Sequence, residues 1–261
     1  MESGKNHIKN IIINNLNMCI IFSIEGNIGS GKSTLVRKLN KYLKDKYQGK
    51  KVIYLAEPVN IWNTITDSKG NTILAKFYEN QYKYAFSFQM MAYISRLSQL
   101  KSTIRENPNS IIITERSVWT DRNVFAKMLY DEYKIEEINY QIYNKWFDEF
   151  VNDVPLSGII YVKTDPTKCL ERVLIRNREG ETIPLEYLEM CSAYHQIWLV
   201  KTKKTVLQLN GNIEFINEIP MEWIQQIEAF INEKINSSYD SNKNELSNEE
   251  LNSIIASTHG V

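Results

Sequence analysis

The sequence has no excess of charge of either sign, because 31 lysines and arginines balance 31 aspartates and glutamates. A chain without a net field is a poor candidate for coating nucleic acid or an anionic membrane surface. The balance suits a small anionic ligand that is held by a local cluster of arginines. We therefore expect small molecules as partners, and neither nucleic acid nor a membrane.

Cysteine and histidine are also scarce, with three residues of each. Cys19, Cys169 and Cys191 are far apart, form no CxxC pair and have no histidine at metal-ligand spacing. This pattern indicates ordinary thiols of a reducing compartment rather than a disulfide framework. No apolar run approaches the ~18 residues of a membrane span, and residues 1–17 lack the layout of a signal peptide. A cytoplasmic protein is the expectation.

The most informative motif present is GxxxxGKS, which runs from Gly26 to Ser33 directly after an apolar stretch. Its glycines let successive backbone N–H groups point at one anion. Lys32 adds a charge for the outer phosphates, and Ser33 offers a hydroxyl to Mg²⁺. The positive end of the following helix strengthens the site. The motif therefore predicts nucleotide-phosphate binding.

Five short apolar runs alternate with segments of helical periodicity. The runs are Cys19–Ile24, Lys51–Ala56, Ser110–Thr114, Gly158–Lys163 and Thr205–Leu209, with helices expected at roughly 31–47, 74–105, 120–130, 135–152, 166–178 and 184–201. Such continuous runs favour a parallel sheet covered on both faces. The alternation predicts one doubly wound α/β domain over residues 18–236. Residues 1–17 are expected to be flexible, and the polar stretch 237–261 disordered.

Three acids follow the first three apolar runs, namely Glu25, Glu57 and Glu115. Ligands of open α/β sheets gather beyond the carboxyl ends of the strands. Pro58 restricts Glu57 to extended geometry, so this carboxylate should project from the strand end. It could accept a proton from a hydroxyl that attacks a γ-phosphate. The alternative is a solvated loop acid.

The dipeptide Glu115-Arg116 ends the third run. Glu115 could hold Mg²⁺, directly or through water, because this hard cation prefers oxygen ligands. Arg116 could bridge the attacking oxygen and the transferred group. A structural ion pair is the alternative interpretation.

A long helix is expected to present Gln89, Ala92 and Arg96 on one face, because these residues are spaced by about one and two turns. An amide can bond a nucleobase edge through two atoms. Asp121, at the start of a later helix, could orient Arg96 and accept an exocyclic amine. The alternative is a polar helix face exposed to solvent.

Three arginines, Arg172, Arg176 and Arg178, stand near the end of a helix that begins at Pro166. A polar segment with a glycine, residues 179–182, follows them. This pattern suits an arginine-rich lid that closes over a triphosphate. The alternative is cations favoured by the negative end of the helix, which explains one or two arginines better than three.

Together these motifs resemble the deoxyribonucleoside kinase family, in particular its deoxycytidine and deoxyguanosine kinase branch. The matching stretches are IEGNIGSGKST (24–34), EPVNIW (57–62), FSFQMMAYISRL (86–97), TERSVWTDR (114–122) and ERVLIRNREGETIPLEYL (171–188). The resemblance implies a P-loop NTPase fold with a five-stranded parallel sheet wrapped by helices, and a homodimer. It implies transfer of the γ-phosphate of ATP, or of another nucleoside triphosphate, to the 5′-hydroxyl of a deoxynucleoside in nucleotide salvage.

The resemblance also implies a role for each matching residue. Glu57 would be the general base with Arg116 beside it, and Tyr78 with Glu181 would hold the 3′-hydroxyl. Only four residues separate Arg178 from Ile183, one fewer than is usual in the family, so Glu179 competes with Glu181. Base contacts are assigned to Trp62, Gln89, Ala92, Arg96, Asp121 and Phe125. Phosphate and Mg²⁺ contacts are assigned to Gly26, Asn27, Ile28, Gly29, Ser30, Gly31, Lys32, Ser33, Thr34, Glu115, Arg172, Arg176 and Arg178.

The pair Arg96 and Asp121 resembles the pocket type that accepts deoxycytidine or a purine deoxynucleoside. An aspartate acceptor favours a base with an exocyclic amine, whereas thymine presents a carbonyl there. We therefore predict these substrates over thymidine. Two alternatives are a non-catalytic nucleotide-binding subunit and a thymidylate-type monophosphate kinase.

Overall fold

Five parallel strands form one sheet in the order β2-β3-β1-β4-β5, as predicted for the fold class. The computed structural model describes residues 19–47, 49–178, 181–214 and 218–237. The expected flexible segment 1–17 and nearly all of the expected tail 237–261 lie outside these residues. The strands are β1 (Ile20–Glu25), β2 (Val52–Leu55), β3 (Ile111–Glu115), β4 (Gly158–Lys163) and β5 (Val206–Asn210).

Burial explains the character of each strand. Every residue of β1 and β3 is buried, whereas the edge strands β2 and β5 are more exposed. The register pairs Ile20 with Ile111 and Phe22 with Gly158. Each observed strand lies within two residues of the predicted one, because strands covered on both faces need continuous apolar runs.

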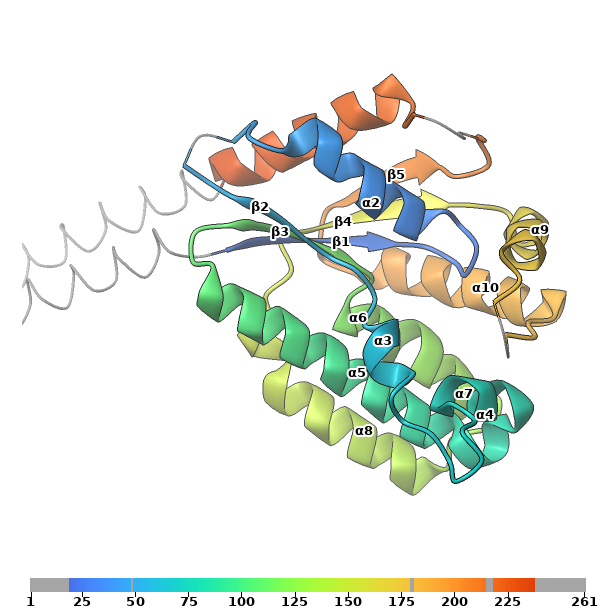
Figure 1. The fold of residues 1–261 in the computed structure, drawn as a ribbon. Helices are drawn as coiled ribbons and strands as arrows, with labels where there is room; N and C mark the ends of the chain where they lie inside the picture. The colour runs from blue at the N-terminus through green and yellow to red at the C-terminus, as the bar shows by residue number, and fades with distance from the viewer. Residues whose placement is uncertain (1–18, 48, 179–180, 215–217, 238–261) are drawn as a thin grey trace, which may run out of the picture.

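Helices cover both faces of the sheet (Figure 1). The helix α2 and the helix over 221–237 pack on one face. The opposite face carries α5, α8 and α10, with α4 packed against α5. The helical segments are α2 (Lys32–Leu43), α3 (Val59–Trp62), α4 (Ile73–Glu79), α5 (Gln81–Glu106), α6 (Val118–Thr120), η1 (Asp121–Ala126), α7 (Lys127–Asp131), α8 (Glu137–Phe150), η2 (Val151–Asp153), α9 (Pro166–Arg176) and α10 (Leu185–Lys201).

Two predicted helices differ from the structure. The segment expected at 74–105 is divided into α4 and α5 at Asn80, whose side chain accepts a hydrogen bond from the N–H of Lys83 at 3.1 Å. Asparagine favours such a cap over a helix interior. The segment expected at 120–130 begins with η1, a π-helix. Wider turns of this kind often occur at functional sites.

The helix over 221–237 was not predicted. It buries Trp223, Ile227 and Phe230 against the sheet face that carries α2. Across the described residues, we find no helix that combines the length and the apolar character needed to cross a bilayer.

Candidate active site

A cavity of about 440 Å³ opens beyond the carboxyl ends of β1, β2 and β3. It gathers residues from the phosphate loop and α2, from the ends of β2 and β3, from α3, α4, α5 and η1, and from α9 and α10. The predicted site residues that line it are Ile28, Gly29, Gly31, Lys32, Ser33, Thr34, Glu57, Trp62, Tyr78, Gln89, Ala92, Arg96, Glu115, Arg116, Asp121, Phe125, Arg172, Arg176, Arg178 and Glu181. The predicted residues Gly26, Asn27 and Ser30 are buried in the loop and do not line the cavity.

The phosphate loop is tightly enclosed by its neighbours. The Asn27 amide donates to the carbonyl oxygen of Leu188 on α10 at 2.7 Å. Gly29 has a φ of +79°, and a Cβ at this position would lie 2.4 Å from the carbonyl oxygen of Cys169 on α9. Only glycine fits both the left-handed backbone and this close approach.

Lys32 is buried within the loop and donates from Nζ to the carbonyl oxygen of Asn27 at 2.5 Å. Burial and, to a lesser extent, the nearby charge of Arg116 lower the pKa of Lys32 to about 7. Glu115 and Glu57 act in the opposite direction. The neutral amine present near this pH is therefore poised to gain a proton when anionic phosphates enter the loop.

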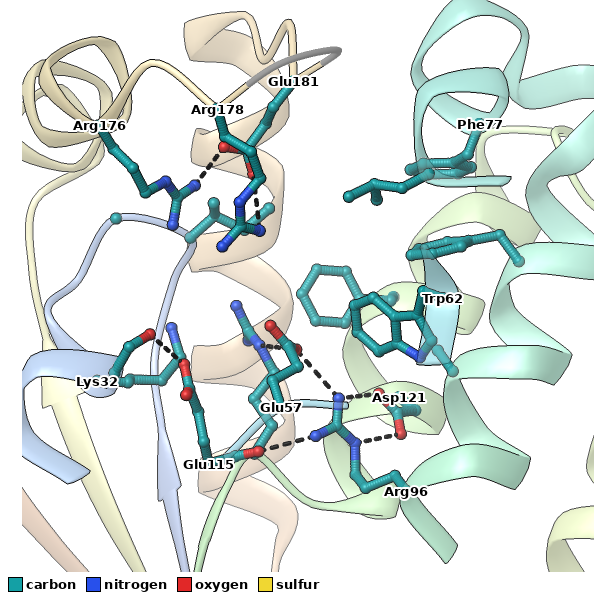
Figure 2. Close-up of a pocket in the computed structure, with 18 of the residues that line it drawn as sticks. Lys32, Glu57, Trp62, Phe77, Arg96, Glu115, Asp121, Arg176, Arg178 and Glu181 are labelled. Atoms are coloured by element: carbon teal, nitrogen blue, oxygen red, sulfur yellow. Dashed lines mark hydrogen bonds and ion pairs between the residues drawn. The ribbon is translucent and has the colours of Figure 1, made fainter. Parts of the chain in front are cut away.

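Two carboxylates and two guanidinium groups form a network at the strand ends, as Figure 2 shows. Oε1 of Glu57 lies 3.1 Å from a terminal nitrogen of Arg96 and 3.4 Å from Nε of Arg116. Nε of Arg96 donates to Asp121 at 2.9 Å, and another nitrogen donates to the backbone carbonyl of Glu115 at 2.8 Å. The network connects β2, α5, β3 and η1.

The network determines the charge on Glu57. Burial would raise the pKa of this carboxyl, but Arg116, Arg96 and Lys32 outweigh burial and hold the pKa below its usual value. Glu57 is therefore ionised at neutral pH. Its side chain, 22% exposed, faces the cavity and can accept a proton from a bound hydroxyl.

Aromatic side chains form the wall of the cavity that Figure 2 shows around Trp62 and Phe77. Nε1 of Trp62 donates to the Ser95 hydroxyl at 2.9 Å, and its ring meets Phe88 edge-on at 5.4 Å. Phe77 stacks on Phe88 at 4.7 Å. Such a wall can enclose a planar base, and Gln89 lines the same cavity.

The predicted lid arginines differ in their contacts. Arg176 and Arg178 pair with Glu181, at 2.5 and 3.9 Å, and lie across the cavity from Lys32 (Figure 2). Arg172 instead donates to the carbonyl oxygen of Gly211, after β5, at 2.9 Å. Burial raises the pKa of Tyr78, and the charge of Glu181 adds to this effect. Tyr78 and Glu181 both line the cavity, while Glu179 lies outside the described residues.

Comparison with known proteins decides the family. The family model "Deoxynucleoside kinase" matches residues 22–236. The chain belongs to the deoxynucleoside kinase family. It is thus an ATP-dependent phosphotransferase, and the alternatives of a non-catalytic subunit and a monophosphate kinase do not apply.

Curated relatives of this kinase are similar over most of their length. Deoxycytidine kinase 2 of Gallus gallus is 36% identical over 238 residues, which cover 83% of this chain and 86% of the relative. Deoxycytidine kinase of Homo sapiens is 32% identical, with coverages of 84% and 86%. The mitochondrial deoxyguanosine kinase of Xenopus laevis is 31% identical, with coverages of 80% and 82%.

The sequence analysis of this kinase missed several residues that line the cavity. They are Arg37, Leu74, Phe77, Phe88 and Tyr187. Arg37 lies one turn after Ser33 on α2, so helical spacing from the phosphate loop could have indicated it. Phe77 carried no such signal, because its place in the wall depends on the break between α4 and α5.

We predict that ATP binding to this kinase takes up close to one proton at pH 8. Lys32 has a pKa of about 7 in the free protein, so it is mostly neutral at this pH, and bound phosphates stabilise its charged form. Calorimetric titration in buffers of different ionisation enthalpy measures the uptake. Lys32→Arg is the control, because a guanidinium stays charged in both states and should show no uptake. The same proton uptake in native protein and control would contradict the assignment.

Proposed function

We propose that this kinase transfers the γ-phosphate of ATP, or of another nucleoside triphosphate, to the 5′-hydroxyl of deoxycytidine and/or a purine deoxynucleoside. The observation that carries the proposal is that Glu57 and Lys32 face one cavity. Both side chains line this cavity, and they lie close enough for the charge of each to shift the pKa of the other. A sugar hydroxyl and a terminal phosphate held in this cavity would therefore meet between an ionised base and a phosphate loop.

The roles follow from the charges. Ionised Glu57 takes the proton of the 5′-hydroxyl while the 5′-oxygen forms a bond to the γ-phosphorus. The bond between this phosphorus and the bridging oxygen of ADP breaks at the same time. Arg116, adjacent to Glu57, stabilises charge on the transferred group. Lys32 holds the outer phosphates, and Arg176 and Arg178 approach them from the opposite wall.

The residues at the loop also fit Mg²⁺. Ser33 Oγ lies 2.5 Å from Oε1 of Glu115, so two oxygen donors meet beside the phosphate loop. The described residues contain no cluster of three acidic, histidine or cysteine ligands, which suits a cation that keeps waters and binds through substrate phosphates. Bound there, Mg²⁺ would neutralise charge on the β- and γ-phosphates. We propose Ser33 and Glu115 as its protein ligands.

Base selection is proposed to depend on Asp121. Burial raises the pKa of this carboxyl, and Arg96 opposes that effect through an ion pair. An oxygen acceptor at this place suits an exocyclic amine, whereas a thymine carbonyl leaves it unpaired, at about 1–3 kcal/mol. The relatives reported above are deoxycytidine and deoxyguanosine kinases, which supports this choice.

We also propose that the kinase is a homodimer, as the resemblance predicts. The outer side of α8 supports this, because its Ile138 and Trp146 are 71% and 50% exposed. Sedimentation velocity should show a species of twice the 30.6 kDa chain mass. A monomer at micromolar concentration would argue against the dimer. The cytoplasmic location stays a prediction from composition.

Glu57→Gln should lower kcat by about 10²- to 10⁴-fold, because the amide cannot accept the proton. ATP affinity should change little, since Glu57 acts on the acceptor. Steady-state kinetics and ATP titration measure both. The matched control is Glu115→Gln, which should raise the Mg²⁺ concentration for half-maximal rate while Glu57→Gln leaves it unchanged. Near-normal turnover of Glu57→Gln would remove this residue from the role of base.

Arg96→Met combined with Asp121→Ala should shift selection toward thymidine by about tenfold or more in the kcat/KM ratio. The double change removes the acceptor together with its cation, so no buried charge is left unpaired. A panel of the four deoxynucleosides with ATP and Mg²⁺ measures the ratio. An unchanged preference would show that other residues determine base choice.

A further inference from the structure

Glu25 is the one acid of the three at the strand ends to which the proposed reaction gives no role. Its side chain is fully buried at the end of β1. The Ser117 hydroxyl donates to Oε1 at 2.6 Å, and the Thr120 hydroxyl donates to Oε2. A buried carboxylate is costly unless its oxygens are satisfied. Each oxygen of Glu25 thus holds one hydroxyl of the segment after β3.

These two hydroxyls belong to a single turn that carries functional side chains at its ends. Arg116 directly precedes Ser117, and Asp121 directly follows Thr120. Within the turn, the N–H groups of Thr120 and Asp121 both donate to the carbonyl oxygen of Ser117, at 3.1 and 3.3 Å. Holding both hydroxyls therefore fixes the turn between the two functional residues.

Arg116 needs such support because its backbone is strained. Its φ is +62°, a left-handed conformation that is costly for a residue with a side chain and persists only when its surroundings enforce it. The Arg116 N–H donates to the carbonyl oxygen of Ile24 at 3.0 Å, and its guanidinium donates to that of Gly26 at 2.9 Å. Glu25, between these two residues, supplies the third attachment of the turn to the end of β1.

We propose that Glu25 is a positioning residue for phosphoryl transfer. It holds the turn 116–121 against the end of β1, so that the Arg116 guanidinium stays beside Glu57 and the phosphate loop. Glu25 itself does not line the cavity and affects the transferred phosphoryl group through Arg116. This inference rests on the proposed roles of Glu57 and Arg116.

The test compares variants that remove or keep one of the two hydrogen bonds. Thr120→Ala removes the hydrogen bond from Thr120 to Glu25, and Thr120→Ser keeps the hydroxyl that donates it. Glu25→Gln changes the acceptor. Thr120→Ala and Glu25→Gln should lower kcat about 10- to 100-fold, because small displacements of a charged group are costly to catalysis. The KM for ATP should change less than about threefold. Thr120→Ser should restore kcat.

Two further measurements separate positioning from general stability. Ser23→Ala is the matched control on β1, because Ser23 is equally buried and its hydroxyl finds no partner within the described part of the chain. It should leave kcat unchanged. In an Arg116→Met background, Thr120→Ala should have little further effect on kcat, since the guanidinium that Thr120 helps to position is already absent. Thermal unfolding shows that each variant is folded.

Native kcat in folded Thr120→Ala would overturn the inference, as would losses that multiply in the Arg116→Met background. If Glu25→Gln does not fold, the two Thr120 variants still decide the matter. Failure of the proposed function has a different signature, because Glu57→Gln would then keep its turnover whatever the result at position 25.

Discussion

The balance of charge in the cleft is the constraint on which the rest of the site depends. Glu57 and Asp121 supply two negative charges, and Arg96 and Arg116 supply two positive ones. Removing one member of a buried ion pair typically costs about 3–5 kcal/mol, because its partner is left uncompensated. Nε of Arg96 donates to Asp121, and one terminal nitrogen donates both to Glu57 and, at 3.5 Å, to Asp121. One guanidinium therefore ties the residue proposed to select the base to the residue proposed to activate the sugar.

Much of this architecture is readable in the sequence because it follows from local rules. Strands covered on both faces must be continuously apolar, and the phosphate loop has a defined glycine and lysine spacing. The sequence also suggested that Asp121 could orient Arg96, and the structure places their side chains 2.9 Å apart. The helix over 221–237 has its buried residues at helical spacing, with Trp223, Ile227 and Phe230 as examples, so this signal was present and overlooked.

Other features arise only from contacts between distant segments. The left-handed conformation of Arg116 depends on Ile24 and Gly26, about ninety residues earlier in the chain. The different partner of Arg172, a carbonyl after β5, depends on how α9 lies against the end of that strand. Neither residue propensity nor spacing along the chain predicts these two contacts, because both contacts form only in the assembled sheet.

The contact between Gly29 and α9 has a consequence for the two walls of the cleft. α9 carries Cys169 against the phosphate loop, and its last residue is Arg176. With only a hydrogen atom at position 29, the loop can approach the backbone of Cys169, in the first turn of α9. Any larger side chain there would widen the gap across which a triphosphate must be gripped. Gly29 thus helps to set the distance between the phosphate loop and Arg176 at the end of α9.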